Sequence, residues 1–209
     1  MSDTVIATRD LSRVEFIALV AALMALNALA IDVMLPALPY MGEALGIAHE
    51  NERQLVVALY MFGFGIAQLA FGPLTDRFGR RAPLLVGLAV YLVCAFAATF
   101  ASNFTVLLAL RFVQGLGAAG TRVIATAVVR DKYSGRAMAE VMSLTFMVFM
   151  AIPILAPGIG QLILLAGPWQ YIFLFMTGLA LMISLWAYVR LPETLHPEYR
   201  RPLSLASVV

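Results

Sequence analysis

The sequence has 209 residues, of which 62% are hydrophobic and 12% are charged, and its mean hydropathy is +0.92. Because a typical soluble domain is about a quarter charged, this composition excludes a soluble globular protein and predicts a membrane protein. The formal net charge of +2 says little about partners, and the single cysteine, Cys94, excludes an intrachain disulfide. No sequence pattern for metal ligands, phosphate binding or a catalytic nucleophile is present. We therefore expect no cofactor, no nucleic-acid partner and no enzymatic activity.

Six apolar segments follow one another along the chain, at residues 14–35, 54–74, 82–100, 106–130, 138–165 and 169–189. Each is about long enough to cross a bilayer as a helix that rises ~1.5 Å per residue. Residues 1–13 form a polar N-terminus, and residues 190–209 form a polar, proline-containing tail. We therefore expect an all-α membrane protein with a bundle of six transmembrane helices and no soluble domain.

The first apolar segment could also be a secretory signal peptide, because Ala28-Leu29-Ala30 resembles a cleavage site. However, Asp32, Pro36 and Pro39 follow it directly, and five more apolar segments come later in the chain. These features favour a helix that stays in the mature protein.

The lysines and arginines predict how the helices are oriented. The loops after the first, third and fifth segments lie on one side of the membrane, and Arg53 is the only basic residue in them. The first of these loops also carries Glu43, Glu50 and Glu52. Eleven of the fourteen basic residues lie on the other side: Arg9, Arg13, Arg77, Arg80, Arg81, Arg130, Lys132, Arg136, Arg190, Arg200 and Arg201. Since basic residues concentrate in cytoplasmic loops, we expect both termini to be cytoplasmic. Residues 72–81, which carry four charges, are expected to form a tight cytoplasmic loop between the second and third helices.

Three charged side chains lie within predicted helices, where insertion into the bilayer costs at least ~2.5–3.5 kcal/mol. They are Asp32, Arg111 and Arg122. At ~1.5 Å per residue, Asp32 lies roughly 27 Å from the cytoplasmic start of its helix and Arg111 about 8 Å below the outer surface. The two residues therefore share a depth and can pair. One hypothesis is that Asp32 gains and loses a proton under the influence of Arg111. The alternative is that the two side chains form a static salt bridge that only holds the helices together, or that each side chain extends independently to the outer surface.

The fourth segment is expected to present a polar face to an aqueous cavity. Arg122 follows Arg111 by eleven residues, which returns it to within ~20° of the same face. Gln114, Gly115 and Ala118 lie on or near this face. Such a face favours water over lipid. The residues predicted to line a substrate cavity are Met24, Asn27, Ala28, Tyr60, Phe64, Gln68, Gln114, Arg122, Met147, Met150, Pro153 and Pro157.

Each group of cavity candidates also has a structural interpretation. Asn27 lies about 140° from Asp32 around its helix, which favours a bond from Asn27 to a neighbouring helix. The four-residue spacing of Tyr60, Phe64 and Gln68 also suits helix packing. Met147 and Met150 could adapt to varied apolar ligands, but methionines are also common in the apolar packing of membrane helices. Pro153 and Pro157 are expected to bend their helix and to leave backbone carbonyl groups without an intrahelical partner.

Several motifs resemble a known family. Gly72-x-Leu74-x-Asp76-Arg77-x-Gly79-Arg80-Arg81 resembles the signature loop of the major facilitator superfamily, and Arg111-x-x-Gln114-Gly115 resembles its helix-4 motif. The whole chain resembles the bicyclomycin-resistance (Bcr/CflA) branch of drug:proton antiporters through three further motifs: Asn27…Asp32-x-x-Leu35-Pro36-x-x-Pro39, Val129-Arg130-Asp131 and Leu191-Pro192-Glu193-Thr194. Pro157-Gly158-x-Gly160 matches the helix-5 antiporter motif only in part, because Ala156 and Gln161 depart from the usual pattern.

The resemblance implies the N-terminal six-helix half of a twelve-helix transporter, built as a 3+3 inverted repeat. The sequence Gly65–Leu69 is echoed by Gly158–Leu162 in the corresponding helix, which agrees with such a repeat. The implied function is efflux of apolar or cationic drugs in exchange for protons across a bacterial inner membrane. The expected partners are a small-molecule drug, protons, membrane lipid and the missing C-terminal half, with a homodimer as the alternative. A sugar or nucleoside transporter and a non-transporting membrane scaffold are the alternative functions.

The resemblance also implies a gate in the cytoplasmic loops, where Asp76, Arg80 and Asp131 form a latch that holds the outward-open state. The alternative is a surface charge cluster that only enforces orientation. The residues assigned to the gate are Gly72, Asp76, Arg77, Gly79, Arg80, Arg130 and Asp131.

Overall fold

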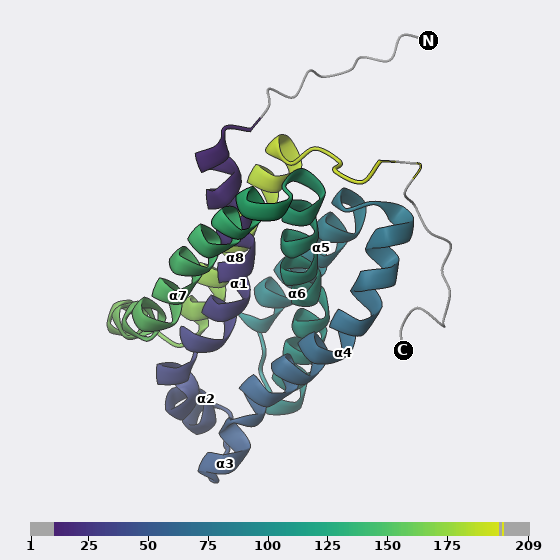
Figure 1. Cartoon of the computed structure of the whole chain (residues 1–209). Coiled ribbons are helices and arrows are strands. Elements are labelled where there is room, and N and C mark those ends of the chain that lie inside the picture. Colours follow the sequence, from purple (N-terminus) through teal and green to yellow (C-terminus); the bar gives the residue numbers. More distant parts are fainter. Residues whose placement is uncertain (1–10, 197, 199–209) are drawn as a thin grey trace.

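The computed structural model describes residues 11–196 and residue 198. The described part is all-helical and contains six long helices (Figure 1). They are α1 (Arg13–Asp32), α4 (Leu55–Phe78), α5 (Arg81–Ala98), α6 (Phe104–Lys132), α7 (Gly135–Ala166) and α8 (Gln170–Arg190). All six are long and apolar enough to cross a membrane, which confirms the predicted fold class. Three residues that we assigned to the basic side, Arg9, Arg200 and Arg201, lie outside the described residues.

The connection between α1 and α4 is itself helical. It contains a short 3-10 helix, η1 (Leu35–Ala37), followed by α2 (Leu38–Ala44) and α3 (Glu50–Arg53). Pro36 and Pro39 lie in the first turns of η1 and α2, where a missing N–H loses no helical hydrogen bond. The two prolines therefore start new helices directly after the first membrane helix.

The stretch that we predicted as a loop, residues 72–81, is mostly helix. α4 continues through Pro73 to Phe78, so only Gly79 and Arg80 separate it from α5. Gly79 has a φ of 88°, a left-handed conformation that glycine adopts at little steric cost. The prediction of a tight reversal is confirmed, but the reversal occupies two residues because the charged sequence before it stays helical.

Two packing centres organise the helices. In the described structure α6 contacts α4 and α5 most extensively and also contacts α1, whereas α7 packs mainly against α1, and α8 packs against α5 and α1. α7 and α8 make few contacts with each other. The start of α1 and the end of α8 lie at the same end of the bundle (Figure 1). We call this the basic end, because the 79–80 and 133–134 connections and their flanking arginines and lysine also lie there.

Glycines allow α6 to approach its neighbours closely. A Cβ on Gly115 would overlap the backbone carbonyl of Tyr60, and one on Gly63 would overlap the carbonyl of Phe112. Gly87 and Gly117 face each other in the same way between α5 and α6. Small residues permit such contacts in membranes, where van der Waals packing drives helix association. Gln114, Gly115 and Ala118 are therefore buried against other helices, so these three residues of the predicted polar face do not line an open cavity in the described structure.

This packing predicts opposite effects for the same substitution at two glycines. Gly115→Ala should lower the melting temperature of the purified protein in detergent, because overpacking against the Tyr60 carbonyl costs about 1–3 kcal/mol. Gly178→Ala is the matched control, since no atom lies within 4 Å of a Cβ placed there and alanine favours the helix. Equal shifts in the melting temperature for the two variants would contradict the packing argument.

Candidate functional site

Arg111 is fully buried where α1, α4 and α6 meet. Its Nε donates to the carbonyl of Val56 on α4 at 3.2 Å, and its Nη2 donates to the carbonyl of Ala30 on α1 at 2.9 Å. Its Nη1 donates to Oε1 of Gln114, one turn further along α6, at 2.7 Å. A single guanidinium thus links three membrane helices through neutral oxygen acceptors.

Tyr60 connects this guanidinium to α1. The Tyr60 ring lies under the Arg111 guanidinium, with the carbon of the guanidinium 4.2 Å from the ring centroid. Such a cation–π contact contributes most when both groups are removed from water. The Tyr60 hydroxyl donates to Oδ1 of Asn27 at 2.9 Å, so Asn27 makes the interhelical bond that was its structural alternative. We call Asn27, Tyr60, Arg111 and Gln114 the Arg111 cluster.

Asp32 is not paired with Arg111 in this structure. Within the described residues, no salt bridge joins the two side chains, although both are described. Asp32 is half-buried at the last position of α1, two residues after Ala30, whose carbonyl accepts the Arg111 bond. The sequence argument placed both charges at one depth. In the structure Arg111, on α6, reaches the turn of α1 that also carries Asp32. It satisfies Arg111 with backbone and amide oxygens instead of the carboxylate, and our expectation of a direct pair is wrong here.

The predicted cavity residues divide into two groups. Arg122 is exposed whereas Arg111 is buried, so the two arginines of α6 do not share an environment. The buried group lies inside the bundle and lines no open surface of the described structure: Met24, Asn27, Ala28, Tyr60, Phe64 and Gln114. The second group is exposed or half-exposed on the surface of α4, α6 and α7: Gln68, Arg122, Met147, Met150, Pro153 and Pro157. Sequence periodicity predicted which residues share a helix face but could not tell which faces another helix covers.

A second polar cluster lies at the basic end and centres on Arg80. The Arg80 Nη1 donates to Oδ1 of Asp76 at 2.7 Å and to the hydroxyl of Thr75 at 2.9 Å, and its Nε donates to Oδ2 of Asp131 at 3.0 Å. Arg80 is buried, which disfavours its charge. The bonds from Asp131 and Asp76 more than offset this burial and raise the pKa of the guanidinium above its ordinary value. We call Asp76, Arg80 and Asp131 the Arg80 latch.

The other predicted gate residues have different roles. Gly79 makes the turn, and the carbonyl of Gly72 accepts the Thr75 hydroxyl at 2.9 Å. Arg130 lines a cavity of about 240 Å³ together with the Arg80 latch. Arg77 is exposed and stacks on Phe78, so it lies outside this cluster.

The segment after α8 completes the latch, a role that sequence analysis did not assign to the Leu191-Pro192-Glu193-Thr194 motif. Oε1 of Glu193 accepts the backbone N–H of Arg80 at 2.8 Å, and Oε2 accepts that of Arg81 at 3.2 Å. A carboxylate here neutralises the free N–H groups and the positive dipole end of α5. The Thr194 hydroxyl donates to Oδ2 of Asp131 at 2.8 Å. Glu193 lies 113 residues after Arg80 and Thr194 lies 63 residues after Asp131, so only the folded bundle brings these partners together.

Within the described residues, no three His, Cys, Asp or Glu side chains are grouped so that they could hold a metal ion. The described polar groups above form ion pairs, a helix cap and interhelical bonds in two clusters, around Arg111 and around Arg80.

Removing the Glu193 carboxylate should loosen the start of α5. In Glu193→Ala, amide hydrogen exchange at Arg80 and Arg81 should be faster, because both N–H groups lose their acceptor. Glu50→Ala, an exposed acid in the first turn of α3, is the control and should leave these amides unchanged. Unchanged protection in Glu193→Ala would show that Glu193 does not cap α5.

The sequence model of the Major Facilitator Superfamily matches residues 20–207. The chain is 36% identical over 175 residues to multidrug resistance protein MdtL of Klebsiella pneumoniae (strain 342), covering 82% of this chain and 44% of that protein. It is 34% identical over 185 residues to MdtL of Salmonella heidelberg (strain SL476), covering 88% and 46%. The chain therefore spans about half the length of the curated relatives it matches.

Two solved transporters share the fold. The human organic anion transporter MFSD10 (TETRAN) superposes with a TM-score of 0.73 at 23% identity, over 94% of this chain and 52% of that chain. A D-xylose-proton symporter superposes with a TM-score of 0.76 at 17% identity, over 90% and 50%. In both cases the six long helices of this chain align with about half of the longer transporter chain. The chain is a multi-pass membrane protein that belongs to the Major Facilitator Superfamily.

Proposed function

We propose that this chain is the N-terminal half of a multidrug efflux transporter that exports drugs in exchange for protons by alternating access. The identity of 34–36% to proteins named for multidrug resistance supports the drug substrate. Alternating access requires a second bundle against which this one can rock, in agreement with the relatives' greater length. The observation that carries the proposal is a buried arginine bonded to the Ala30 carbonyl of α1, two residues before the half-buried carboxylate of Asp32.

In this proposal Asp32 is the proton carrier. It is the acid at the end of α1, where the helix meets η1, and no salt bridge to it is present in the described structure. A carboxylate in a partly dry site is protonated more readily when no cation is near and less readily when one approaches. Asp32 lies on α1 and Arg111 on α6, so a movement of α1 against α6 that breaks the bond from Arg111 to the Ala30 carbonyl changes the distance between the two charges. Such a movement couples proton binding to helix rearrangement.

The basic end is proposed to be the cytoplasmic end, with both termini in the cytoplasm of a bacterial cell and the bundle in its inner membrane. The concentration of arginines there supports this orientation. The Arg80 latch is then a cytoplasmic gate. Its bonds tie the end of α4 to the end of α6 while the outer side is open, and they must loosen when the cytoplasmic side opens.

The proton-carrier role predicts the effect of a neutral isostere. Asp32→Asn, in the transporter that contains both halves, should reduce drug resistance of expressing cells to the level of cells without the transporter. Glu43→Gln, which neutralises an exposed acid of α2, is the matched control and should keep resistance. Growth on a panel of drugs and the amount of protein in the membrane are the measurements. Full resistance in Asp32→Asn at normal protein levels would remove Asp32 from the mechanism.

The gate role predicts a change in access at the cytoplasmic end. Asp131→Asn removes the carboxylate that accepts from Arg80 and Thr194, so the latch should loosen and open more often. A cysteine at Thr126, which lines the same cavity, should then react faster with a maleimide in a Cys94→Ser background. Glu52→Gln, on α3 at the opposite end of α4, is the control. If Asp131→Asn left the labelling rate unchanged, these residues would be a static charge cluster.

A further inference from the structure

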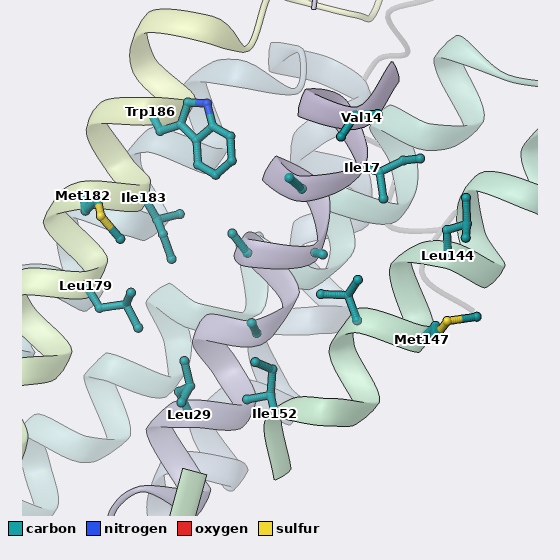
Figure 2. A pocket seen from close by; sticks show the side chains of 15 residues that line it. Val14, Ile17, Leu29, Leu144, Met147, Ile152, Leu179, Met182, Ile183 and Trp186 are labelled. Carbon is teal, nitrogen blue, oxygen red and sulfur yellow. The ribbon is translucent and has the colours of Figure 1, made fainter. Parts of the chain in front are cut away.

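A long apolar groove runs along α1 between α7 and α8. It has a volume of about 560 Å³ and is lined by side chains of all three helices (Figure 2). Every lining residue is apolar, apart from the indole nitrogen of Trp186 near one end. The walls open outward, because Met147 and Val148 on α7 and Met182 on α8 are largely exposed. The groove is thus a furrow in the outer surface of the membrane-spanning bundle.

The groove exists because α1 presents small side chains where α7 and α8 stay apart. Its floor is formed by the alanines at the helical spacing of one face: Ala18, Ala21, Ala22 and Ala25. On the other side of the bundle, glycines let α6 close tightly against α4 and α5. On this side α7 and α8 make few contacts with each other, so the alanine face stays uncovered.

The dimensions of the groove suit one lipid tail. It runs along α1 from Val14 near the basic end to Leu29, fifteen residues that span about 22 Å at ~1.5 Å per residue. The hydrocarbon of one leaflet is about 15 Å thick, so a tilted chain from the leaflet at the basic end can follow this path. Because water in such a furrow finds no hydrogen-bond partners, the groove is filled by apolar matter in a bilayer.

The charges at the basic end of the groove suit an anionic headgroup. Glu15 accepts from Arg190 at 2.6 Å and from Nε1 of Trp186 at 3.5 Å, and Arg13 pairs with Glu140 at 2.8 Å. Arg136, in the first turn of α7, lies one helical turn before Glu140, and Glu140 lies one turn before Leu144 in the groove wall. Among the described residues there, the three arginines Arg13, Arg136 and Arg190 outnumber the two carboxylates of Glu15 and Glu140. Tryptophan and basic residues at this position are typical of the headgroup level.

We propose that this groove is a binding site for a single anionic phospholipid, whose acyl chain lies on the alanine face of α1 between α7 and α8. The bound chain fills the furrow and links two helices that scarcely touch each other. The site is separate from the Arg111 cluster and the Arg80 latch, and it does not depend on drug transport. A failure of one proposal therefore leaves the other open to its own test.

Trp186 provides a probe for this site. In a Trp169→Phe background it is the only tryptophan, and its fluorescence is quenched when a brominated acyl chain lies beside it. The purified protein in detergent is titrated with phosphatidylglycerol or phosphatidylcholine brominated near the headgroup end of the chain. We expect quenching by phosphatidylglycerol to saturate at about one lipid per chain, and phosphatidylcholine to require more lipid.

Variants that fill the groove should abolish the saturable quenching. Ala22→Phe fills it from the floor, and Val148→Phe fills it from the α7 wall at an exposed position that does not disturb the core. Ala89→Phe, on an exposed face of α5 outside the groove, is the matched control and should keep saturation.

Two results would overturn the proposal. Quenching that rises without saturation and equally in all variants would mean that only bulk lipid surrounds Trp186. Native mass spectrometry that detects a dimer, lost in Ala22→Phe, would mean that a second copy of the chain covers the groove. One retained phosphatidylglycerol per chain, lost in both groove variants, is the expected mass spectrum.

Discussion

The positive charge of Arg111, buried between three membrane helices, constrains much of this structure. An isolated charge there costs at least ~2.5–3.5 kcal/mol on insertion scales, so its donors must all find acceptors. α1 and α4 each supply a backbone carbonyl, α6 supplies the amide of Gln114, and the Tyr60 ring covers one face. These contacts fix the depth and rotation of three helices relative to one another. Through Ala30 they also place the end of α1, with Asp32, beside the arginine.

Such contacts require backbones to come close, and the glycines of α4, α5 and α6 make this possible. The carbonyl of Tyr60 lies where a Cβ of Gly115 would be, so the same turn of α4 that supplies the Tyr60 ring also contacts α6 directly. The other side of the bundle, where α1 meets α7 and α8, is packed less closely. There α1 carries alanines instead of glycines, α7 and α8 make few contacts with each other, and an apolar furrow remains between them.

The two ends of the bundle differ as much as its two sides. At the basic end, α4, α5, α6 and the segment after α8 meet in one set of charge-assisted bonds around Arg80. Each bond joins different elements, so the bonds of this cluster can all form only when several helices hold their relative positions. This property suits a gate, because a small displacement of one helix removes several bonds together. Arg111 links the helices deeper in the bundle, and the Arg80 latch links them at the surface.

The sequence alone determined the membrane class, the six spanning segments, the family and the identity of the charged residues in both clusters. These features depend on local composition, periodicity and short motifs, which remain visible in one dimension. Only the tertiary structure decided which face of α6 is covered, that Arg111 bonds to neutral oxygens instead of Asp32, and that Glu193 caps α5. It also showed that residues 72–78 stay helical and that an apolar groove lies along α1. These features depend on the rotation of each helix about its axis and on contacts between residues far apart in sequence. Helical periodicity groups residues on one face, but the neighbouring helices determine what that face meets.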